Sequence, residues 1–544
     1  METIVADPKV KRVLISVTDK SGVVDFARAL AEEFGAEIVS TGGTAKALEQ
    51  AGVAVRPIDD LTGFPEMMDG RVKTLHPRVH GGLLARRDLK THMAAAAEHG
   101  IGMIDMVVVN LYAFEATVAH AGVTFGEAIE NIDIGGPSML RSAAKNHASV
   151  AVVTDPTSYD EILAELRAHE GATTLATRTK LALEVFRLTS AYDNAIYNWL
   201  RGQLDDSDSL AQGQGQAQTQ AFAADSRLFL AKAQELRYGE NPHQKAAFYH
   251  NPVKGSQGTV NPAYQLANAT QLQGKELSYN NYLDLDAAWG AVREFDEPTC
   301  VIVKHLTPCG IASADDIVVA YQRAHDCDTV SAFGGVMAFN RPVTGAIVEA
   351  IYANGQFIEA IIAPSFAAEA RELFTQKPNA RILETGGLNP PGGLLDYRSV
   401  EGGMLAQTPD TVGEDPSAFT VPTKRQPTAT ELDELLFAWK ACKSVKSNAI
   451  LIARDKATVG AGAGQPNRVN SAQLAVKQAG EKARGAAAAS DAFMPFADSL
   501  EVLIAAGVTA VIQPGGSIRD EEVIAAADAA NVALVFTGHR HFRH

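Results

Sequence analysis

Short apolar runs alternate with amphipathic stretches through the first 150 residues, and this alternation restricts the possible folds more than any other feature. Strands that alternate with helices form a parallel, doubly wound sheet of the α/β class. Ligands of such sheets bind beyond the carboxyl ends of the strands, so the loops that follow the strands are the expected functional sites. The predicted strands are residues 13–17, 37–40, 106–111 and 150–154, and the predicted helical regions are residues 22–34, 45–50 and 158–204.

One low-complexity stretch divides the chain. Residues 212–220 consist of Gln, Gly, Ala and Thr, a composition that is too polar to pack and typical of a spacer. We predict a linker over residues 205–225, a first domain of residues 1–204 with its core in about 1–155, and a second domain of residues 226–544. The second domain is again mixed α/β, with strands at 301–303, 449–452 and 510–512 and helices near 471–489 and 521–530.

Charge and apolar pattern exclude several classes of protein. The chain has 48 Lys and Arg against 64 Asp and Glu, a net charge of −16, whereas an open nucleic-acid or anionic-membrane surface is basic. A basic start followed by an apolar stretch is missing, as is an uncharged apolar run of about 20 residues, so we expect a cytoplasmic protein without signal peptide or membrane span. Four cysteines without a Cys-x-x-Cys pair predict neither a disulfide framework nor a structural zinc site.

Three glycine-rich loops in the first half could form an anion site: two follow predicted strands, and the third opens a helix. Residues 40–44 (STGGT), 19–22 (DKSG) and 132–138 (IDIGGPS) could turn backbone N–H groups toward a phosphate, although steric need alone also explains such glycines. Residues 71–80 hold five cationic or titratable side chains, which favours a sugar phosphate as ligand and leaves open a surface loop paired with acids. Arg141 and Lys145, four residues apart, share a helix face that is either solvated or turned to the same anion.

In the second half, Lys304 and His305 end a buried strand, and Pro308 and Gly310 are predicted to force a turn. Histidine suits proton transfer near neutral pH, and a neighbouring ammonium would keep it neutral. The alternative is a lone histidine satisfied at a strand end. Three further clusters favour a site: residues 237–244 (RYGENPHQ), and the small-residue loops 331–335 and 461–465. Residues 539–544 (HRHFRH) form either a disordered tail or a lid that carries cations to a phosphate.

Together these motifs resemble the bifunctional purine-biosynthesis family that joins AICAR transformylase to IMP cyclohydrolase. The resemblance covers nearly the whole chain. Its motifs are residues 62–67 (TGFPEM), 71–77 (RVKTLHP), 110–112 (NLY), 132–136 (IDIGG), 144–147 (AKNH), 236–244 (LRYGENPHQ), 304–305 (KH), 490–493 (SDAF) and the C-terminal residues 539–544.

The resemblance implies a methylglyoxal-synthase-like doubly wound parallel sheet in the N-terminal domain, cytidine-deaminase-like α/β units in the C-terminal region, and an intertwined homodimer. Cytidine deaminases bind zinc, but Pro308-Cys309 has no second cysteine at the required spacing and no His-x-Glu is present, so the resemblance is to a metal-free branch. No catalytic metal is predicted. The family allows a structural potassium ion, whose ligands the sequence does not place.

For formyl transfer, the resemblance implies that the 5-amino group of AICAR attacks the formyl carbon of the co-substrate 10-formyltetrahydrofolate. His305 would take the amine proton, Lys304 would stabilise the oxyanion or protonate the leaving folate nitrogen, and Asn448 would orient these groups. The family positions for substrate binding are Arg237, Tyr238, His243, Asp491, Phe493, Arg540, Phe542 and His544.

For ring closure of formyl-AICAR to IMP, the carboxamide nitrogen attacks the formyl carbon and water is lost. The catalytic positions carried over from the family are Lys73, Tyr112, Asp133 and Lys145, with Lys73 and Tyr112 assigned to the oxyanion and Asp133 to proton transfer. The nucleotide- and phosphate-binding positions are Ser16, Thr18, Lys20, Thr41, Gly42, Gly43, Thr44, Arg71 and Thr74.

Two other readings remain. The first half could be a methylglyoxal-synthase-like lyase, which binds a small phosphorylated substrate but needs carboxylates where residues 71–74 supply cations. It could also be a non-catalytic module that senses purine nucleotide and regulates the second half.

Overall fold

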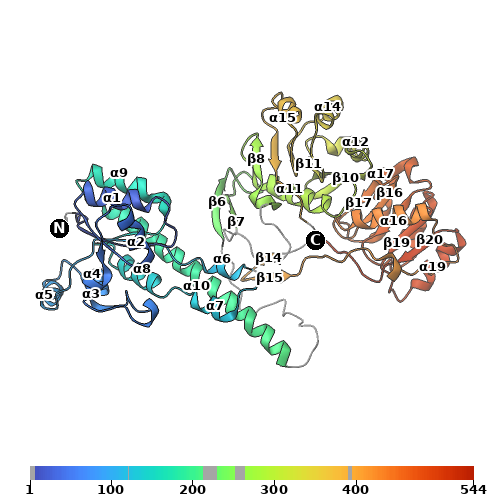
Figure 1. Ribbon diagram of the computed structural model, residues 1–544. Coiled ribbons are helices and arrows are strands. Elements are labelled where there is room, and N and C mark those ends of the chain that lie inside the picture. Colours follow the sequence, from blue (N-terminus) through green and yellow to red (C-terminus); the bar gives the residue numbers. More distant parts are fainter. Residues whose placement is uncertain (1–6, 121, 212–229, 251–263, 390–394) are drawn as a thin grey trace. The chain divides into compact units, whose positions relative to one another are not determined.

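The computed structural model describes residues 7–120, 122–211, 230–250, 264–389 and 395–544 (Figure 1). The chain divides into two compact units, residues 1–228 and 229–544. Each is described by itself below.

The first unit is built on a five-stranded parallel sheet of order β3-β2-β1-β4-β5, and the four predicted strands are confirmed. Alternate residues of each strand enter two separate cores: Val13 and Ile15 face one and Leu14 faces the other. Both faces are therefore covered, as expected for a doubly wound sheet. The strands are β1 Arg12–Ser16, β2 Glu37–Ser40, β3 Arg56–Pro57, β4 Met106–Val109 and β5 Ala151–Val153.

Helices of this unit pack on the two faces of the sheet (Figure 1). Helices α1 (Val23–Glu32) and α9 (Tyr159–Ala168) bury their apolar stripes in one core. Helices α3 (Ile58–Thr62), α4 (Pro77–Leu84), α8 (Gly135–Lys145) and α10 (Leu175–Ala211) contribute to the other. The remaining helices are α2 (Gly42–Gln50), α5 (Lys90–Glu98), α6 (Phe114–Val118), α7 (Phe125–Glu130) and the short 3-10 turns η1 (Met68–Gly70) and η2 (Pro156–Ser158).

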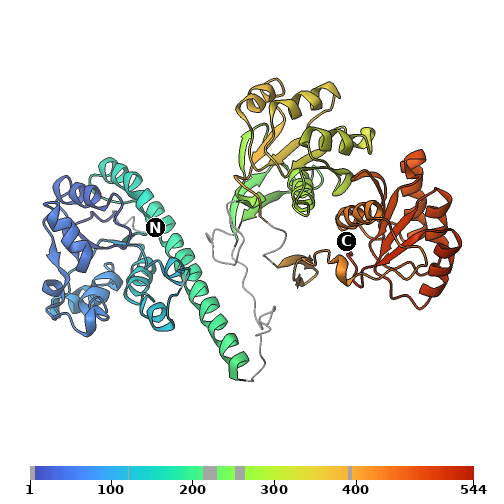
Figure 2. The same ribbon diagram turned by 45° about the vertical axis from the view of Figure 1, so that its right-hand side comes forward.

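Helix α10 extends well past the sheet (Figure 2) and runs to Ala211. Residues 205–211, expected in the linker, therefore belong to a helix. No Gly or Pro interrupts residues 203–211, so an acidic, serine-rich sequence can continue a helix that is already nucleated. The rest of the predicted linker, residues 212–225, lies outside the described residues.

The second unit contains an eleven-stranded mixed sheet of order β20-β19-β18-β16-β17-β10-β9-β11-β12-β13-β8. Two separate hairpins, β6 (Ala231–Leu236) with β7 (Ala246–His250) and β14 (Asp396–Val400) with β15 (Gly403–Gln407), complete its strands. The sheet strands are β8 Thr270–Gln273, β9 Thr299–Lys304, β10 Thr307–Ser313, β11 Val336–Phe339, β12 Ala360–Ala363, β13 Arg381–Glu384, β16 Ile450–Arg454, β17 Ala457–Gly462, β18 Ala487–Ser490, β19 Ala510–Gln513 and β20 Ala533–Phe536.

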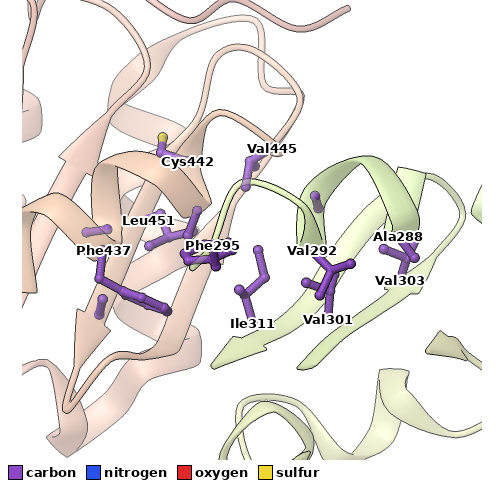
Figure 3. Packing of buried hydrophobic residues seen from close by; sticks show 14 of the residues in the cluster. Ala288, Val292, Phe295, Val301, Val303, Ile311, Phe437, Cys442, Val445 and Leu451 are labelled. Carbon is purple, nitrogen blue, oxygen red and sulfur yellow. The ribbon is translucent and has the colours of Figure 1, made fainter. Parts of the chain in front are cut away.

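Helices α11 (Tyr279–Val292) and α16 (Ala429–Cys442) share one face of this sheet and one core with the buried rings of Trp289 and Trp439. Figure 3 shows that core, where Phe295 and Phe437 meet with ring centroids 5.5 Å apart. The other face is covered by α12 (Ile317–His325), α14 (Gly345–Ala353) and α15 (Ala368–Phe374) over one half, and by α17 (Arg468–Ala479), α18 (Asp498–Ala505) and α19 (Asp520–Ala529) over the other. The short elements are α13 (Thr329–Ala332), η4 (Leu266–Asn268), η5 (Pro416–Ala418) and η6 (Gly480–Ala483).

The two halves of this sheet repeat one plan. In each half a helix precedes a hairpin, α11 before β9–β10 and α16 before β16–β17, and the halves join where β10 pairs with β17. The packing of the following helix is repeated too. A Cβ on Gly310 would meet the carbonyl of Ala324 in α12, and a Cβ on Gly460 would meet that of Ala475 in α17. The second unit is therefore a structural duplication.

Two sequence expectations are wrong in this unit. Pro308 and Gly310 lie within β10 rather than in a turn, and a β-bulge between them accommodates the proline, while His305 and Leu306 make the turn. The helix predicted for residues 471–489 ends at Ala479, and residues 487–490 form β18. Alanine favours helices, but a fully buried central position in the sheet overrides that preference.

Candidate active sites

Helix α2 begins at Gly42, three residues before the predicted start, with Thr41 as its N-cap residue. The N–H groups of the first turn therefore belong to the glycines, and Gly42 has a φ of 45° that favours glycine. The Ser16 and Thr41 hydroxyls lie 2.9 Å apart and join the ends of β1 and β2. The buried Thr44 hydroxyl instead bonds the main chain of Val17, so it is already satisfied within the protein.

The loop after β1 is held by Asn110, a residue to which the sequence analysis gave no role. Its Oδ1 accepts the N–H groups of Thr18 and Asp19 at 2.6 and 3.0 Å, and its Nδ2 donates to the carbonyl of Asp19. The Lys20 ammonium lies 3.4 Å from the Thr18 carbonyl. These amides are already bonded within the protein, so Lys20 is the cation that this loop can offer to a ligand.

The cationic segment reaches both glycine-rich loops. The Lys73 ammonium lies 3.3 Å from the position that a Cβ on Gly42 would take, and at the same distance from that of Gly70. The Thr74 hydroxyl lies 2.7 Å from the corresponding position on Gly135. Side chains larger than glycine would therefore collide with Lys73 and Thr74. The structure therefore places residues 73–74 beside Gly42 and Gly135 of the two glycine-rich loops.

Asp133 and Tyr112 are neighbours in this group. The Asp133 carboxylate accepts the N–H of Gly136 at 2.8 Å and also the N–H of Tyr112. Burial raises the pKa of Asp133 despite these two bonds, and burial together with the Asp133 charge raises the pKa of Tyr112. The hydroxyl of Tyr192 in α10 accepts the N–H of Asp133 at 2.8 Å. Tyr192 lies 59 positions away in sequence, so no local motif pointed to it.

One of the predicted residues, Lys145, lies apart from this group. Lys145 ends the 11-residue helix α8, whose N-terminal end lies beside Asp133, so about 15 Å of helix rise separate the two. Arg71 forms an exposed ion pair with Glu130.

In the second unit, a cavity of about 220 Å³ opens at the β9–β10 turn. The Lys304 ammonium donates to the carbonyl of Phe333 at 2.8 Å, and the His305 side chain is exposed. Burial raises the pKa of Cys309 to about 12, which disfavours a nucleophilic thiolate. The cavity is lined by Lys304, His305, Thr307, Pro308, Cys309, Asp328, Ser331, Ala461 and Gln478, so both small-residue loops contribute to it.

Asn448 belongs to a buried polar network. Its Nδ2 donates to the carbonyl of Gln465 at 2.8 Å, and its Oδ1 accepts from Arg468 at 2.8 Å. Arg468 also forms an ion pair with Asp491, whose other oxygen accepts the hydroxyl of Ser447. Asp491 is fully buried, so its carboxylate orients these neighbours. Arg468 was missed because a single arginine at the start of a helix carries no sequence signal.

The C-terminal segment packs beside this network. The main chain of His541 donates to the carbonyl of Asp491, and Ser447 donates to that of Arg543 at 2.8 Å. The buried His541 ring lies 2.6 Å from Asp410. The Arg540 guanidinium stacks on Phe542 at 4.2 Å, and the His544 ring lies 5.7 Å from that of Phe542. The segment is thus a packed element that carries cations rather than a free tail.

Residues 237–244 connect β6 to β7. Arg237 stacks on Tyr238 at 5.5 Å, and Asn280 in α11 donates to the carbonyl of Glu240. Burial raises the pKa of Asp286 in α11, and the positive charge of Arg543 opposes part of this rise. This loop and the C-terminal segment therefore both approach α11.

Among the described residues, several predicted positions are not part of the cavity lining. These are Arg237, Tyr238, His243, Asn448, Asp491, Phe493, Arg540, Phe542 and His544. In the parts of the chain that the structure describes, no group of three or more His, Cys, Asp or Glu side chains is placed to hold a metal ion, and no helix is long and apolar enough to span a membrane.

Comparison with known proteins gives two family matches that together cover most of the chain. The family described as "AICARFT/IMPCHase bienzyme" matches residues 143–478, more than half of the chain, and the "MGS-like domain" matches residues 22–138. The second match confirms the methylglyoxal-synthase-like first domain. A solved structure described as "Crystal structure of ForH" is 36% identical over a match that covers 34% of this chain and 97% of that chain, with a TM-score of 0.32.

Proposed function

This chain belongs to the AICARFT/IMPCHase bienzyme family, and on that premise we propose how its residues divide the two reactions. The protein is a bifunctional enzyme of the last two steps of IMP synthesis, a folate-dependent formyltransferase and an IMP cyclohydrolase. We assign the cyclohydrolase to residues 1–204 and the transformylase to residues 226–544. Of the segment 205–225 between them, residues 205–211 continue helix α10, and we propose the remainder as the linker.

Formyl transfer takes place at the turn after β9. The 5-amino group of AICAR attacks the formyl carbon of 10-formyltetrahydrofolate, and His305 accepts the proton that the amine loses. Lys304 stabilises the oxyanion or protonates the leaving folate nitrogen. Support comes from the cavity of about 220 Å³, which both side chains line. Asn448 orients the reacting groups, and the residues 237–244 and 540–544 bind the nucleotide.

Ring closure takes place at the carboxyl end of the first sheet. The carboxamide nitrogen of formyl-AICAR attacks the formyl carbon, and water is eliminated. Lys73 and Tyr112 stabilise the oxyanion, Asp133 moves the proton, and the α2 amides with Lys20 bind the phosphate. The proximity of Lys73 to Gly42 supports this arrangement, since it places the ammonium beside the phosphate loop. Lys145, at the far end of α8, is the weakest of the proposed catalytic positions.

The ligands of the two sites are AICAR, 10-formyltetrahydrofolate, formyl-AICAR and IMP. We further propose that the protein is a cytoplasmic homodimer that binds neither nucleic acid nor membrane. We also propose that neither reaction uses a catalytic metal. A structural potassium ion stays a prediction without assigned ligands.

The observation that carries the proposal is the shared cavity of Lys304 and His305, and a mass-resolved product assay tests it. The full chain receives AICAR and 10-formyltetrahydrofolate without added metal. Appearance of IMP together with tetrahydrofolate supports both assignments. Accumulation of formyl-AICAR contradicts the roles of Lys73 and Asp133. Failure of formyl transfer, while supplied formyl-AICAR is cyclised, contradicts those of Lys304 and His305.

A further inference from the structure

The turn that presents His305 has an unfavourable backbone. His305 and Leu306 have φ angles of 54° and 63°, in the left-handed region that residues other than glycine seldom adopt. A two-residue hairpin turn with both φ angles positive is formed most readily by Asn-Gly or Gly-Gly. Histidine enters this region more often than most side chains, but a bulky leucine does not favour it, so contacts from the rest of the protein must stabilise the turn at Leu306.

One such contact comes from α11. The Asp284 Oδ1 accepts the N–H of Leu306 at 2.7 Å, so a side chain of α11 bonds the main chain of the turn directly. Helix α11 is itself fixed, since Trp289 and Val292 are buried in the core and Ser278 closes a capping box with Asn281. Asp284 thus restrains the turn from the α11 face of the sheet, whereas Gln478 of α17 lines the cavity from the opposite face.

The duplicated half uses the same device. Asp455 and Lys456 form the β16–β17 turn with φ angles of 53° and 51°, and the Glu434 carboxylate from α16 accepts the Lys456 N–H at 2.9 and 3.1 Å. That turn carries Arg454 and Asp455 in place of Lys304 and His305. The carboxylate therefore belongs to the backbone of the turn in both halves, and only one half adds the Lys-His pair.

We infer that Asp284 is a positioning residue for formyl transfer. Its carboxylate holds the Leu306 N–H, and through it the left-handed turn, so that His305 and Lys304 face the cavity together. This inference rests on the proposed roles of His305 and Lys304. Loss of the bond releases a turn conformation that Leu306 does not favour, and the histidine then spends less time in the reactive geometry.

The test compares Asp284→Ala, Asp284→Asn and Glu434→Ala in the full chain. Asp284→Ala lowers kcat for formyl transfer by about 10- to 100-fold, while KM for AICAR changes less than about twofold, because the nucleotide contacts lie elsewhere. Asp284→Asn keeps an oxygen acceptor and restores kcat to within about threefold. Glu434→Ala, the matched change in the other turn, leaves kcat within about twofold of the parent enzyme.

Several outcomes overturn the inference. An unchanged kcat in Asp284→Ala does so, and so does an equal loss in Glu434→Ala, which would indicate a general structural role. If the melting curve shows that Asp284→Ala does not fold, the Asp284→Asn variant tests the inference instead. If that variant melts at the temperature of the parent enzyme but has a kcat lowered more than about tenfold, positioning by an acceptor oxygen is rejected. A His305→Ala variant tests the proposed function of the turn separately from the role of Asp284. If it still transfers formyl groups, the proposed function of the turn fails, whatever Asp284 does.

Discussion

Arg468 and Asp491 form an ion pair that solvent barely reaches, since 7% of Arg468 and none of Asp491 is exposed. The same arginine binds the side-chain oxygen of Asn448. The buried guanidinium of Arg468 therefore neutralises Asp491 and at the same time holds Asn448, the residue proposed to orient the formyl-transfer groups.

Replacement of Arg468 by Met should lower the free energy of unfolding of the second unit by about 3–5 kcal/mol, because the Asp491 carboxylate is left buried without a cation. Urea unfolding measures this loss. The double variant Arg468→Met/Asp491→Asn removes the unpaired charge and should recover part of the stability. A loss below about 1 kcal/mol in the single variant would contradict the buried pair as a source of stability.

Substitutions in the two sites should separate the two activities. We expect His305→Ala to lower formyl transfer by at least about 100-fold and to leave cyclisation of supplied formyl-AICAR unchanged. Lys73→Ala should do the reverse and let formyl-AICAR accumulate. Mass-resolved product analysis distinguishes the cases. Normal IMP output from Lys73→Ala would refute its role, and loss of both activities in His305→Ala would indicate misfolding or a wrong assignment.

Tyr192→Phe should slow cyclisation without affecting formyl transfer. The Tyr192 hydroxyl accepts the Asp133 N–H, and its removal leaves a partly buried donor unpaired beside the proposed proton-transfer residue. A decrease in kcat of about tenfold is expected, with little change in KM for formyl-AICAR. Tyr197→Phe, on the same helix, serves as a control. Equal rates for Tyr192→Phe and the parent enzyme would exclude a positioning role for this hydroxyl.

The pH profile of cyclisation should report the environment of Asp133. Burial raises its pKa above the ordinary value of 3.8, and a protonated carboxyl cannot accept the proton released in ring closure. Activity should therefore fall as the pH is lowered through the raised pKa, at a higher pH than an exposed aspartate would give. The kcat/KM of Asp133→Asn should lose this acidic limb. An acidic limb that persists in Asp133→Asn would assign the titration to another group.

The sequence predicted four of the five strands of the first sheet because each of these four is a short apolar run buried on both faces, as residues 13–17 and 106–109 show. The two-residue edge strand β3 (Arg56–Pro57) has no apolar pattern and was not predicted. It failed where tertiary contacts decide between local alternatives. Residues 487–490 are alanine-rich and yet form a central strand, and Pro308 lies in a strand because a bulge accommodates it.

For the sites, glycine-rich loops and cationic clusters were visible in the sequence, and the structure brings Lys73, Thr74 and Asp133 together with residues 41–44. The residues that hold these groups were not visible. Asn110, Tyr192, Asp284 and Arg468 act through hydrogen bonds to segments that are distant in the sequence. Such hydrogen-bond partners depend on the folded geometry, so no local sequence pattern predicts them.

The duplicated hairpins separate what must be inherited for folding from what must be inherited for chemistry. At the β16–β17 turn, Glu434 holds the backbone and the proposed reaction uses neither Arg454 nor Asp455, so residues that tolerate the positive φ of position 455 can replace Asp455 without loss of the hairpin. At the β9–β10 turn substitutions are more restricted, because the proposed reaction needs both the backbone conformation and the side chains of Lys304 and His305. Among descendants of this sequence, we expect the β16–β17 turn to change in sequence faster than the β9–β10 turn. The common origin of the two hairpins would then be visible only in their backbone conformation.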